Sequence, residues 1–293
     1  MRWKQLVLVP VLVAVLLPAS AQIKGIDPAV LGKATAGDAQ AQYHVGQAYA
    51  LGEGVAQDFE QGAAWYLKAA DQGVAGAQYE LGLLFHFGRG VGQSDAQAAA
   101  WYRKAADQGV AGAELNLGTL YDQGLGVPQD HAQAAGWYRK AALQGVAEAQ
   151  FNLGSLYERG VGVPQDHAQA ADLYRRAAEQ GNAAAEFNLG LLYDNGQGVA
   201  QDLAQAAAWY KKAAEQGLAR AQYNLGSMFA LGQGVPLNYA EAWFWLDLAA
   251  ANWNGARQQQ AAEARDKVAA RLSPGELTGA QQRSAKWLAE HKR

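Results

Sequence analysis

One pattern of apolar and polar positions recurs six times along the chain, with a period of 36 residues. The copies start near Ala41, Ala77, Ala113, Ala149, Ala185 and Ala221. In the first half of each copy, apolar residues recur at i, i+2, i+5 and i+6, which fills one broad face of a helix. The second half is rich in Ala, carries a Trp-Tyr pair in most copies and has Lys or Arg toward its end, as in HAQAAGWYRKAALQG. Each copy therefore predicts two helices, here called helix A and helix B, which need neighbouring copies to bury their apolar faces.

Glycines separate the predicted helices and also interrupt one of them. A G-x-G pair follows each helix A, and we expect it to supply the positive φ of the turn; the pairs begin at Gly52, Gly88, Gly124, Gly160, Gly196 and Gly232. A further glycine lies inside each helix A, where it costs about 1 kcal/mol relative to alanine; these are Gly46, Gly82, Gly118, Gly154, Gly190 and Gly226. Because the cost recurs in every copy, we predict that helix B presses on the backbone of helix A there.

The two ends of the chain depart from the repeat. Residues 1–21 start with basic residues, continue as an apolar run and end in small residues, which predicts a signal peptide and a periplasmic or secreted protein. The run is shorter than the roughly 20 residues that a membrane-spanning helix needs, so an uncleaved anchor is the less favoured alternative. Residues 22–38 predict a partial N-terminal cap, 39–255 the six repeats and 256–293 C-terminal capping helices. Ser273 and Glu276 predict a capping box in the last of these.

The shared motif A-x-[FY]-x-L-G-x-x-[YF]-x-x-G-x-G-V-x-x-D-x-x-x-A-x-x-W-Y-[RK]-[RK]-A-A-x-x-G resembles the Sel1-like repeat, a relative of the tetratricopeptide repeat. The resemblance implies an all-α fold, namely an α/α solenoid in which six helix-turn-helix repeats form a right-handed superhelix with a helical C-terminal cap. It also implies that the chain binds other proteins. Exported bacterial members of the family suggest a regulator of sensor kinases, a scaffold of an assembly machine, or an immunity protein that neutralises a toxic effector.

Composition and charge narrow the range of partners. The chain has no cysteine, which excludes thiol enzymes and separates it from Sel1-like proteins with one disulfide per repeat, some of them linked to β-lactam binding. Residues 22–256 carry 14 Lys+Arg against 23 Asp+Glu, whereas residues 257–293 carry 8 against 4. Because a nucleic-acid groove needs a basic stripe, the acidic body disfavours that class of partner. We expect a protein partner (an envelope regulator, an assembly component or a toxin) and no integral membrane association after signal cleavage.

The sequence offers no recognisable catalytic constellation. His131 and His167 recur at one repeat position, so equivalent helices about 10 Å apart hold them too far from each other to share a zinc ion. The motifs of zinc proteases, P-loops, dinucleotide sites and serine acyl enzymes are absent. We therefore expect no catalytic residue, no cofactor and no metal site. An envelope enzyme that acts on β-lactams or peptidoglycan is the alternative.

Two further sets of recurring residues are interpreted as structural. Aspartates such as Asp58, Asp130, Asp166 and Asp202 precede helix B and suit its N-terminus. The Trp-Tyr pairs, from Trp65 and Tyr66 onward, are interpreted as core packing rather than as a carbohydrate platform.

Positions that change from copy to copy are free to recognise a partner. In helix A they fall at i, i+3 and i+7, one stripe that solenoid analogy places on a concave face. The candidate partner-binding residues are His44, Gln47 and Leu51; Glu80, Leu83 and Phe87; Asn116, Thr119 and Gln123; Asn152, Ser155 and Arg159; Asn188, Leu191 and Asn195; and Asn224, Ser227 and Leu231. Leu51, Leu83, Phe87, Leu191 and Leu231 are the expected apolar anchors, unless some of them pack against the next repeat.

Overall fold

The computed structural model describes residues 25–291, and within this range it contains fifteen α-helices and no strand. The predicted signal peptide lies outside the described residues. The helices form two compact units, which divide after Gln144 and are described one at a time. Over residues 25–291, no helix combines the length and the apolar character that crossing a membrane requires. The all-α prediction is confirmed.

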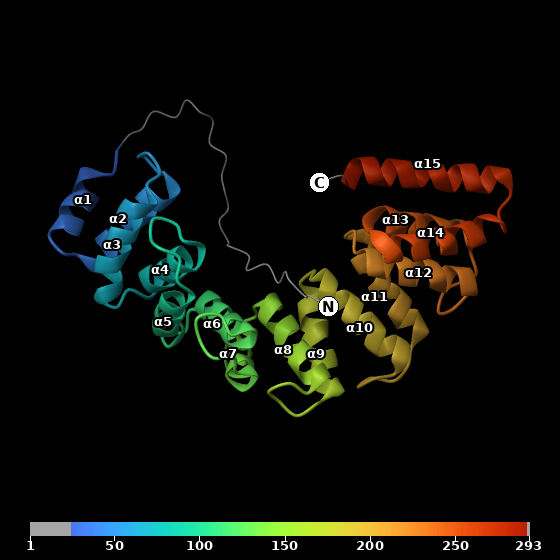
Figure 1. The fold of residues 1–293 in the computed structure, drawn as a ribbon, viewed down its shortest axis with the longest axis horizontal. Helices are drawn as coiled ribbons and strands as arrows, with labels where there is room; N and C mark the ends of the chain where they lie inside the picture. Colours follow the sequence, from blue (N-terminus) through green and yellow to red (C-terminus); the bar gives the residue numbers. More distant parts are fainter. Residues whose placement is uncertain (1–24, 292–293) are drawn as a thin grey trace. The chain divides into compact units, whose positions relative to one another are not determined.

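Unit 1 contains a short leading helix and three helix pairs. Its helices are α1 (Pro28–Thr35), α2 (Ala39–Leu51), α3 (Phe59–Asp71), α4 (Ala75–Phe87), α5 (Asp95–Ala106), α6 (Ala111–Gln123) and α7 (His131–Leu143). Each helix packs on the one before it, so that α2, α4 and α6 are the A helices and α3, α5 and α7 the B helices (Figure 1). Helix α1 packs against α2 where a preceding helix B would lie, in the segment predicted as an N-terminal cap.

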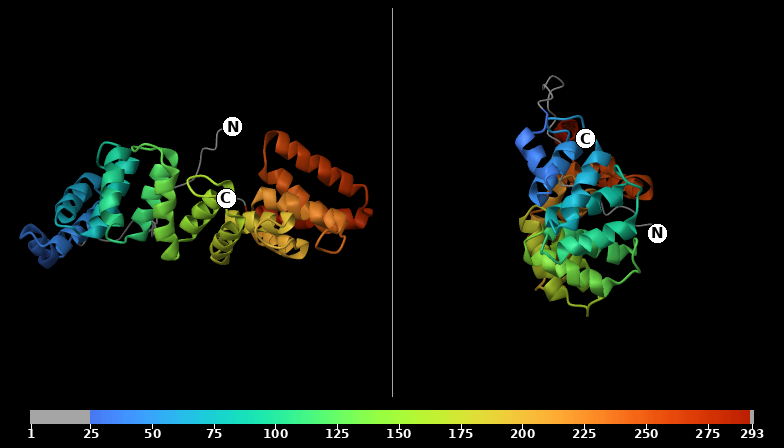
Figure 2. Two further views of the ribbon diagram at one scale, coloured as in Figure 1. Left: turned by 90° about the horizontal axis from the view of Figure 1, so that it is seen from below. Right: turned by 90° about the vertical axis from the view of Figure 1, so that its left-hand side faces the viewer.

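Unit 2 continues the same alternation and ends in two additional helices. Its helices are α8 (Ala147–Arg159), α9 (His167–Glu179), α10 (Ala183–Asn195), α11 (Leu203–Glu215), α12 (Ala219–Leu231), α13 (Tyr239–Asn252), α14 (Gly255–Ala269) and α15 (Pro274–His291). Figure 2 shows this unit in two further views, coloured from yellow-green to red along the chain. Helix α14 packs on α13, and α15 also packs on α13 rather than pairing with α14. The predicted capping box opens α15, since the Ser273 N–H donates to Glu276 Oε2 at 2.8 Å.

The glycine inside helix A is where helix B presses on it, as predicted. The tyrosine of helix B is fully buried in five copies, which are Tyr66, Tyr102, Tyr138, Tyr174 and Tyr210. A Cβ atom on Gly118 would lie 2.7 Å from Cδ1 of Tyr138, and one on Gly190 would lie 2.7 Å from Cδ1 of Tyr210. Only a residue without a side chain lets the ring approach so closely.

The tryptophan of the Trp-Tyr pair behaves differently from its neighbour. Trp65, Trp101 and Trp209 are only partly buried, and a lysine of the same helix stacks on each indole. Lys104 Nζ, for example, lies 3.8 Å from the ring centre of Trp101. The interpretation of both residues as core packing therefore holds for the tyrosines, whereas most of these tryptophans form a cation–π pair at the surface.

Side-chain amides join successive repeats in a ladder that sequence reasoning missed. In unit 1, Gln108 Nε2 donates to the Gly73 carbonyl oxygen at 3.1 Å and to Gln78 Oε1 at 2.7 Å. Gln78 Nε2 in turn donates to the Ala70 carbonyl oxygen at 3.1 Å. In unit 2 the same separation of 30 residues joins Gln180 to Gln150, Gln216 to Glu186 and Asn252 to Gln222. The ladder satisfies buried polar groups and fixes the register of one repeat on the next.

Candidate partner-binding surfaces

The first position of the predicted stripe points toward the buried tyrosines. In unit 2, the side chains of Asn188 and Asn224 hydrogen-bond the hydroxyls of Tyr174 and Tyr210 on the preceding helix B. Those hydroxyls also donate to acids of their own repeat, with Tyr174 at 2.6 Å from Glu158 Oε2. Asn116 in unit 1 and Asn152 in unit 2 are buried. Asn188 and Asn224 therefore have structural contacts of their own, whereas the buried Nδ2 of Asn152 has no hydrogen-bond partner in the described part of the chain.

Glu80 and His44 stand at this first position where the other copies have asparagine. Burial raises the pKa of the Glu80 carboxyl to about 6. Burial, and then the nearby Glu80 carboxylate, raise the pKa of the Tyr66 hydroxyl. His44 is exposed, and its Nδ1 lies 3.2 Å from Gln47 Oε1. In the first two repeats, the first position thus carries ionisable groups in place of an amide.

The middle position of the stripe is mostly engaged with its own helix. Thr119 Oγ1 donates to the Leu115 carbonyl oxygen at 3.1 Å, and Ser227 Oγ to that of Tyr223 at 2.9 Å. Leu191 packs against the main apolar cluster of unit 2, the arrangement foreseen as the alternative to an exposed anchor. The remaining members are Gln47, Leu83 and Ser155, all partly buried.

The last position of the stripe reaches the surface most fully. Leu51 is 44% exposed and Leu231 is 66% exposed, while Phe87 is partly buried beside the guanidinium of Arg89, 5.3 Å from the ring centre. Gln123, Arg159 and Asn195 are exposed. Leu83 and Phe87 stand one turn apart on α4, and neither belongs to the apolar cluster around Tyr66, Leu81 and Leu84.

Of the two histidines considered as metal ligands, His131 pairs with a carboxylate, whereas the buried Nδ1 of His167 has no hydrogen-bond partner among the described residues; His86 forms a pair of the same kind as His131. His131 Nδ1 lies 2.8 Å from Asp122 Oδ1, and His86 Nδ1 lies 2.6 Å from Asp95 Oδ1. The two pairs occupy equivalent repeat positions with histidine and aspartate exchanged, so each joins the end of helix A to the start of helix B. Among residues 25–291 there is no group of three or more His, Asp or Glu placed to hold a metal ion.

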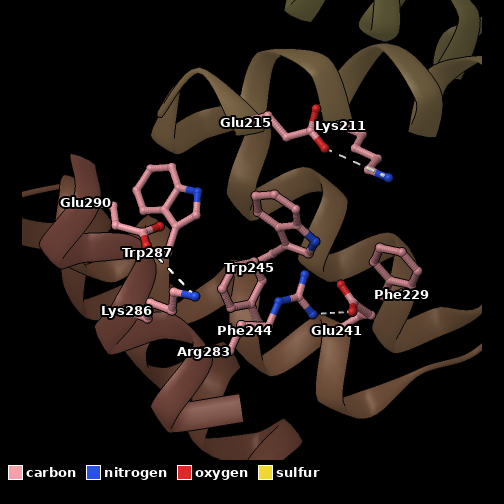
Figure 3. Close-up of a pocket in the computed structure, with 10 residues that line it drawn as sticks. All are labelled: Lys211, Glu215, Phe229, Glu241, Phe244, Trp245, Arg283, Lys286, Trp287 and Glu290. Atoms are coloured by element: carbon pink, nitrogen blue, oxygen red, sulfur yellow. Dashed lines mark hydrogen bonds and ion pairs between the residues drawn. The ribbon is translucent and has the colours of Figure 1, made fainter. Parts of the chain in front are cut away.

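A pocket that sequence reasoning missed lies near the C-terminal end of unit 2. It has a volume of about 420 Å³ and is formed by α11, α12, α13 and α15 (Figure 3). Its lining residues are Lys211, Glu215, Phe229, Glu241, Phe244, Trp245, Arg283, Lys286, Trp287 and Glu290. The sequence departs from the repeat in this region through the aromatic residues Trp243, Phe244 and Trp253. Of these three, Phe244 lines the pocket, and α15 adds Trp287 over α13.

Comparison with known proteins gives one family and several structures of similar fold. A family model described as Sel1 repeat matches residues 39–74, 75–110, 111–146, 147–182, 183–218 and 219–252. A Sel1 repeat protein from Oxalobacter formigenes is 37% identical with a TM-score of 0.62, over 72% of this chain and 84% of that one. An immunity protein from Pseudomonas aeruginosa is 22% identical with a TM-score of 0.40, over 79% of this chain and 86% of that one. No curated protein shows a significant match.

Proposed function

The chain belongs to the Sel1 repeat family, and from this premise we propose that it is a non-enzymatic binding protein of the bacterial cell envelope, which recognises a partner protein on the helix A side of its repeats. Sel1 repeats form a scaffold suited to protein–protein interaction. The envelope location is supported by the signal-peptide pattern of residues 1–21. A regulator, an assembly component and a toxin are all partners of this kind.

The observation that carries the proposal is the pair Leu83 and Phe87. Both are large apolar side chains at variable positions, where other copies of the repeat have Thr, Ser, Gln, Arg or Asn and, in some copies, Leu. Both are partly buried on α4, outside the apolar cluster of the repeat. A partner that covers them removes apolar surface from water, and such anchors carry most of the affinity of a protein interface. Because they lie outside that cluster, we expect the fold to depend on them little.

The test compares alanine variants on the two sides of unit 1. Leu83→Ala and Phe87→Ala are each expected to weaken binding of the partner recovered from the native envelope by more than about 1 kcal/mol, with the fold intact. Leu51 on α2 and Leu67 on α3 are both 44% exposed, so Leu51→Ala and Leu67→Ala form a matched pair. We expect the helix A variant to lose affinity and the helix B variant to keep it.

Two results would contradict the proposal. Equal losses for Leu51→Ala and Leu67→Ala would show that helix A is not the recognition side. Turnover of nitrocefin or peptidoglycan by the purified protein, abolished by a single side-chain change, would instead support an envelope enzyme.

A further inference from the structure

The pocket near the C-terminal end of unit 2 arises because α15 leaves the pattern of paired helices. Helix α15 packs on α13, where Ser284 Oγ donates to Asp247 Oδ2 at 2.7 Å. Trp287 and Leu288 then pack against the main apolar cluster of the unit. Helices α11 and α15 thus flank a hollow whose floor is α13 (Figure 3). The pocket is formed mainly by the B helices α11 and α13 and by α15, with Phe229 from the A helix α12, and no residue of the stripe lines it.

The floor of the pocket is aromatic and rigidly held. Phe244 and Trp245 are 2% and 3% exposed, and their rings meet edge to face with centroids 4.8 Å apart. In the four earlier copies that have this tryptophan, a lysine three residues later stacks on the indole, whereas Leu248 takes that place after Trp245 and is buried. Trp245 is therefore packed into the main apolar cluster of the unit and has no lysine of its own helix over its ring. Phe229 and Trp287 complete an aromatic wall of the kind that receives an anchoring side chain.

The rim of the pocket is charged and balanced. The Arg283 guanidinium is fixed, since it pairs with Glu241 and lies 3.8 Å over the Phe244 ring. The other two pairs are loose: Lys211 Nζ lies 3.8 Å from Glu215 Oε1, and Lys286 Nζ lies 4.0 Å from Glu290 Oε1. Exposed pairs of this kind contribute little to stability, so their charges can turn toward a ligand at little cost.

We propose that this pocket binds a peptide segment of a partner protein, which inserts one aromatic side chain against Phe229 and Trp287, above the buried Trp245, and carries flanking residues of both charges. A polyanion would meet three carboxylates on the rim, namely Glu215, Glu241 and Glu290. A peptide offers backbone donors and acceptors together with charged side chains, and so it can satisfy ammonium, guanidinium and carboxylate groups at once. The inference rests on the proposed function in that the ligand belongs to a protein, but it concerns a second surface.

The test uses the ¹⁵N-labelled full chain and small probes of defined chemistry. The capped tripeptide acetyl-Lys-Trp-Glu-amide is titrated while the indole N–H signals are followed by NMR, with acetyl-Lys-Ala-Glu-amide as its control and N,N′-diacetylchitobiose as the sugar probe. We expect saturable shifts of the Trp245 and Trp287 signals with the tryptophan peptide and an unchanged Trp101 signal. Trp287→Ala should lower the affinity for the tryptophan peptide at least tenfold. Trp101→Ala, a matched variant in unit 1, should leave that affinity unchanged.

A second variant tests the rim without disturbing the packing. The Lys286 side chain is 78% exposed, so we expect Lys286→Glu to preserve the fold. This variant should weaken binding of acetyl-Lys-Trp-Glu-amide at least threefold and strengthen binding of acetyl-Lys-Trp-Lys-amide. Equal shifts with the alanine peptide, shifts with the sugar alone, or no shift with any probe would overturn the inference. Phe87→Ala should leave the peptide affinity unchanged, so failure of this site and failure of the helix A surface are separate results.

Discussion

Asp247 on α13 accepts a hydrogen bond of 2.8 Å from Arg265 Nη1 on α14, eighteen residues further along the chain. The same separation joins Arg103 to the hydroxyl of Tyr121 in unit 1 and Arg175 to that of Tyr193 in unit 2. In the regular repeats the arginine lies on helix B and the acceptor on the next helix A. At the end of unit 2 the donor and the acceptor have exchanged helices. Helix α14 therefore stands in the register of a seventh helix A. Its pair is an arginine with an aspartate, whereas the regular repeats pair an arginine with a tyrosine.

Reversing the charge at Asp247 should loosen the C-terminal helices. Asp247→Arg sets two guanidinium groups against each other and removes the acceptor of Ser284, so we expect a loss of about 1–3 kcal/mol in the free energy of unfolding by urea. Adding Arg265→Tyr recreates the pairing of Arg175 with Tyr193 and should recover part of that loss. Asp266→Ala, at an exposed acid beside Arg265, should change stability by less than about 0.5 kcal/mol. A double variant no more stable than Asp247→Arg alone would contradict the shared register.

Two glycines of unit 1 should respond to alanine in opposite directions. A Cβ on Gly118 would lie 2.7 Å from the Tyr138 ring, so Gly118→Ala should destabilise by about 1–3 kcal/mol through overpacking. A Cβ on Gly136 of α7 would meet nothing within 4 Å, so Gly136→Ala should stabilise by about 0.5–1 kcal/mol through helix propensity. Thermal melts of both variants check this. Equal effects would show that the ring contact does not limit the packing.

The acids in the amide ladder should make stability depend on pH. Burial raises the pKa of Glu114 and of Glu186, although Gln144 and Gln216 each donate a hydrogen bond that opposes the shift. A carboxyl whose pKa is raised by folding favours the folded state below its unfolded pKa, and this advantage is lost as the pH rises through the folded pKa. Glu114→Gln should therefore raise the free energy of unfolding by about 1 kcal/mol at pH 7–8. The variant removes the buried charge, and its amide nitrogen stands at the repeat position from which Gln78 donates a hydrogen bond to the Ala70 carbonyl oxygen.

The gain in stability from Glu114→Gln should shrink toward pH 4, because the native carboxyl is then protonated and, like the amide, carries no charge. Glu179→Gln, at an exposed acid on α9, should show no such trend. Urea unfolding at several pH values measures both variants, and a gain for Glu114→Gln that is constant with pH would contradict the assignment.

Ionic strength should act mainly on the rate at which the partner arrives. Residues 22–256 hold 14 Lys+Arg against 23 Asp+Glu, so the repeats attract a basic partner surface at long range. Raising salt from about 0.05 to 0.5 M shortens the Debye length and should slow association more than it speeds dissociation. Surface plasmon resonance separates the two rates. If salt changed only the dissociation rate, the acidic residues would lie within the interface with the partner, which would contradict this prediction.

The sequence predicted the repeat fold because its determinants are local and periodic. Glycine after helix A, aspartate before helix B and the glycine inside helix A each follow from one backbone requirement, and the structure shows all three. The position of α15 could not be predicted in this way. Its direction depends on contacts between distant residues, such as Ser284 with Asp247, and the pocket depends on that direction. The burial of Asn116 was missed for a similar reason, since a position that varies between copies can still face a neighbouring helix.

The amide ladder allows the chain to gain or lose whole repeats during evolution. Each rung joins residues at fixed separations, as Gln72 does with Gln42 and Gly37, and Gln108 with Gln78 and Gly73. Loss of residues 75–110 would leave Gln144 with Glu114 and bring the Gly73 carbonyl oxygen to the place that Gly109 now holds. A gene that gains or loses segments of 36 codons by unequal recombination therefore keeps every rung paired, so the number of repeats can evolve independently of the interactions that join them.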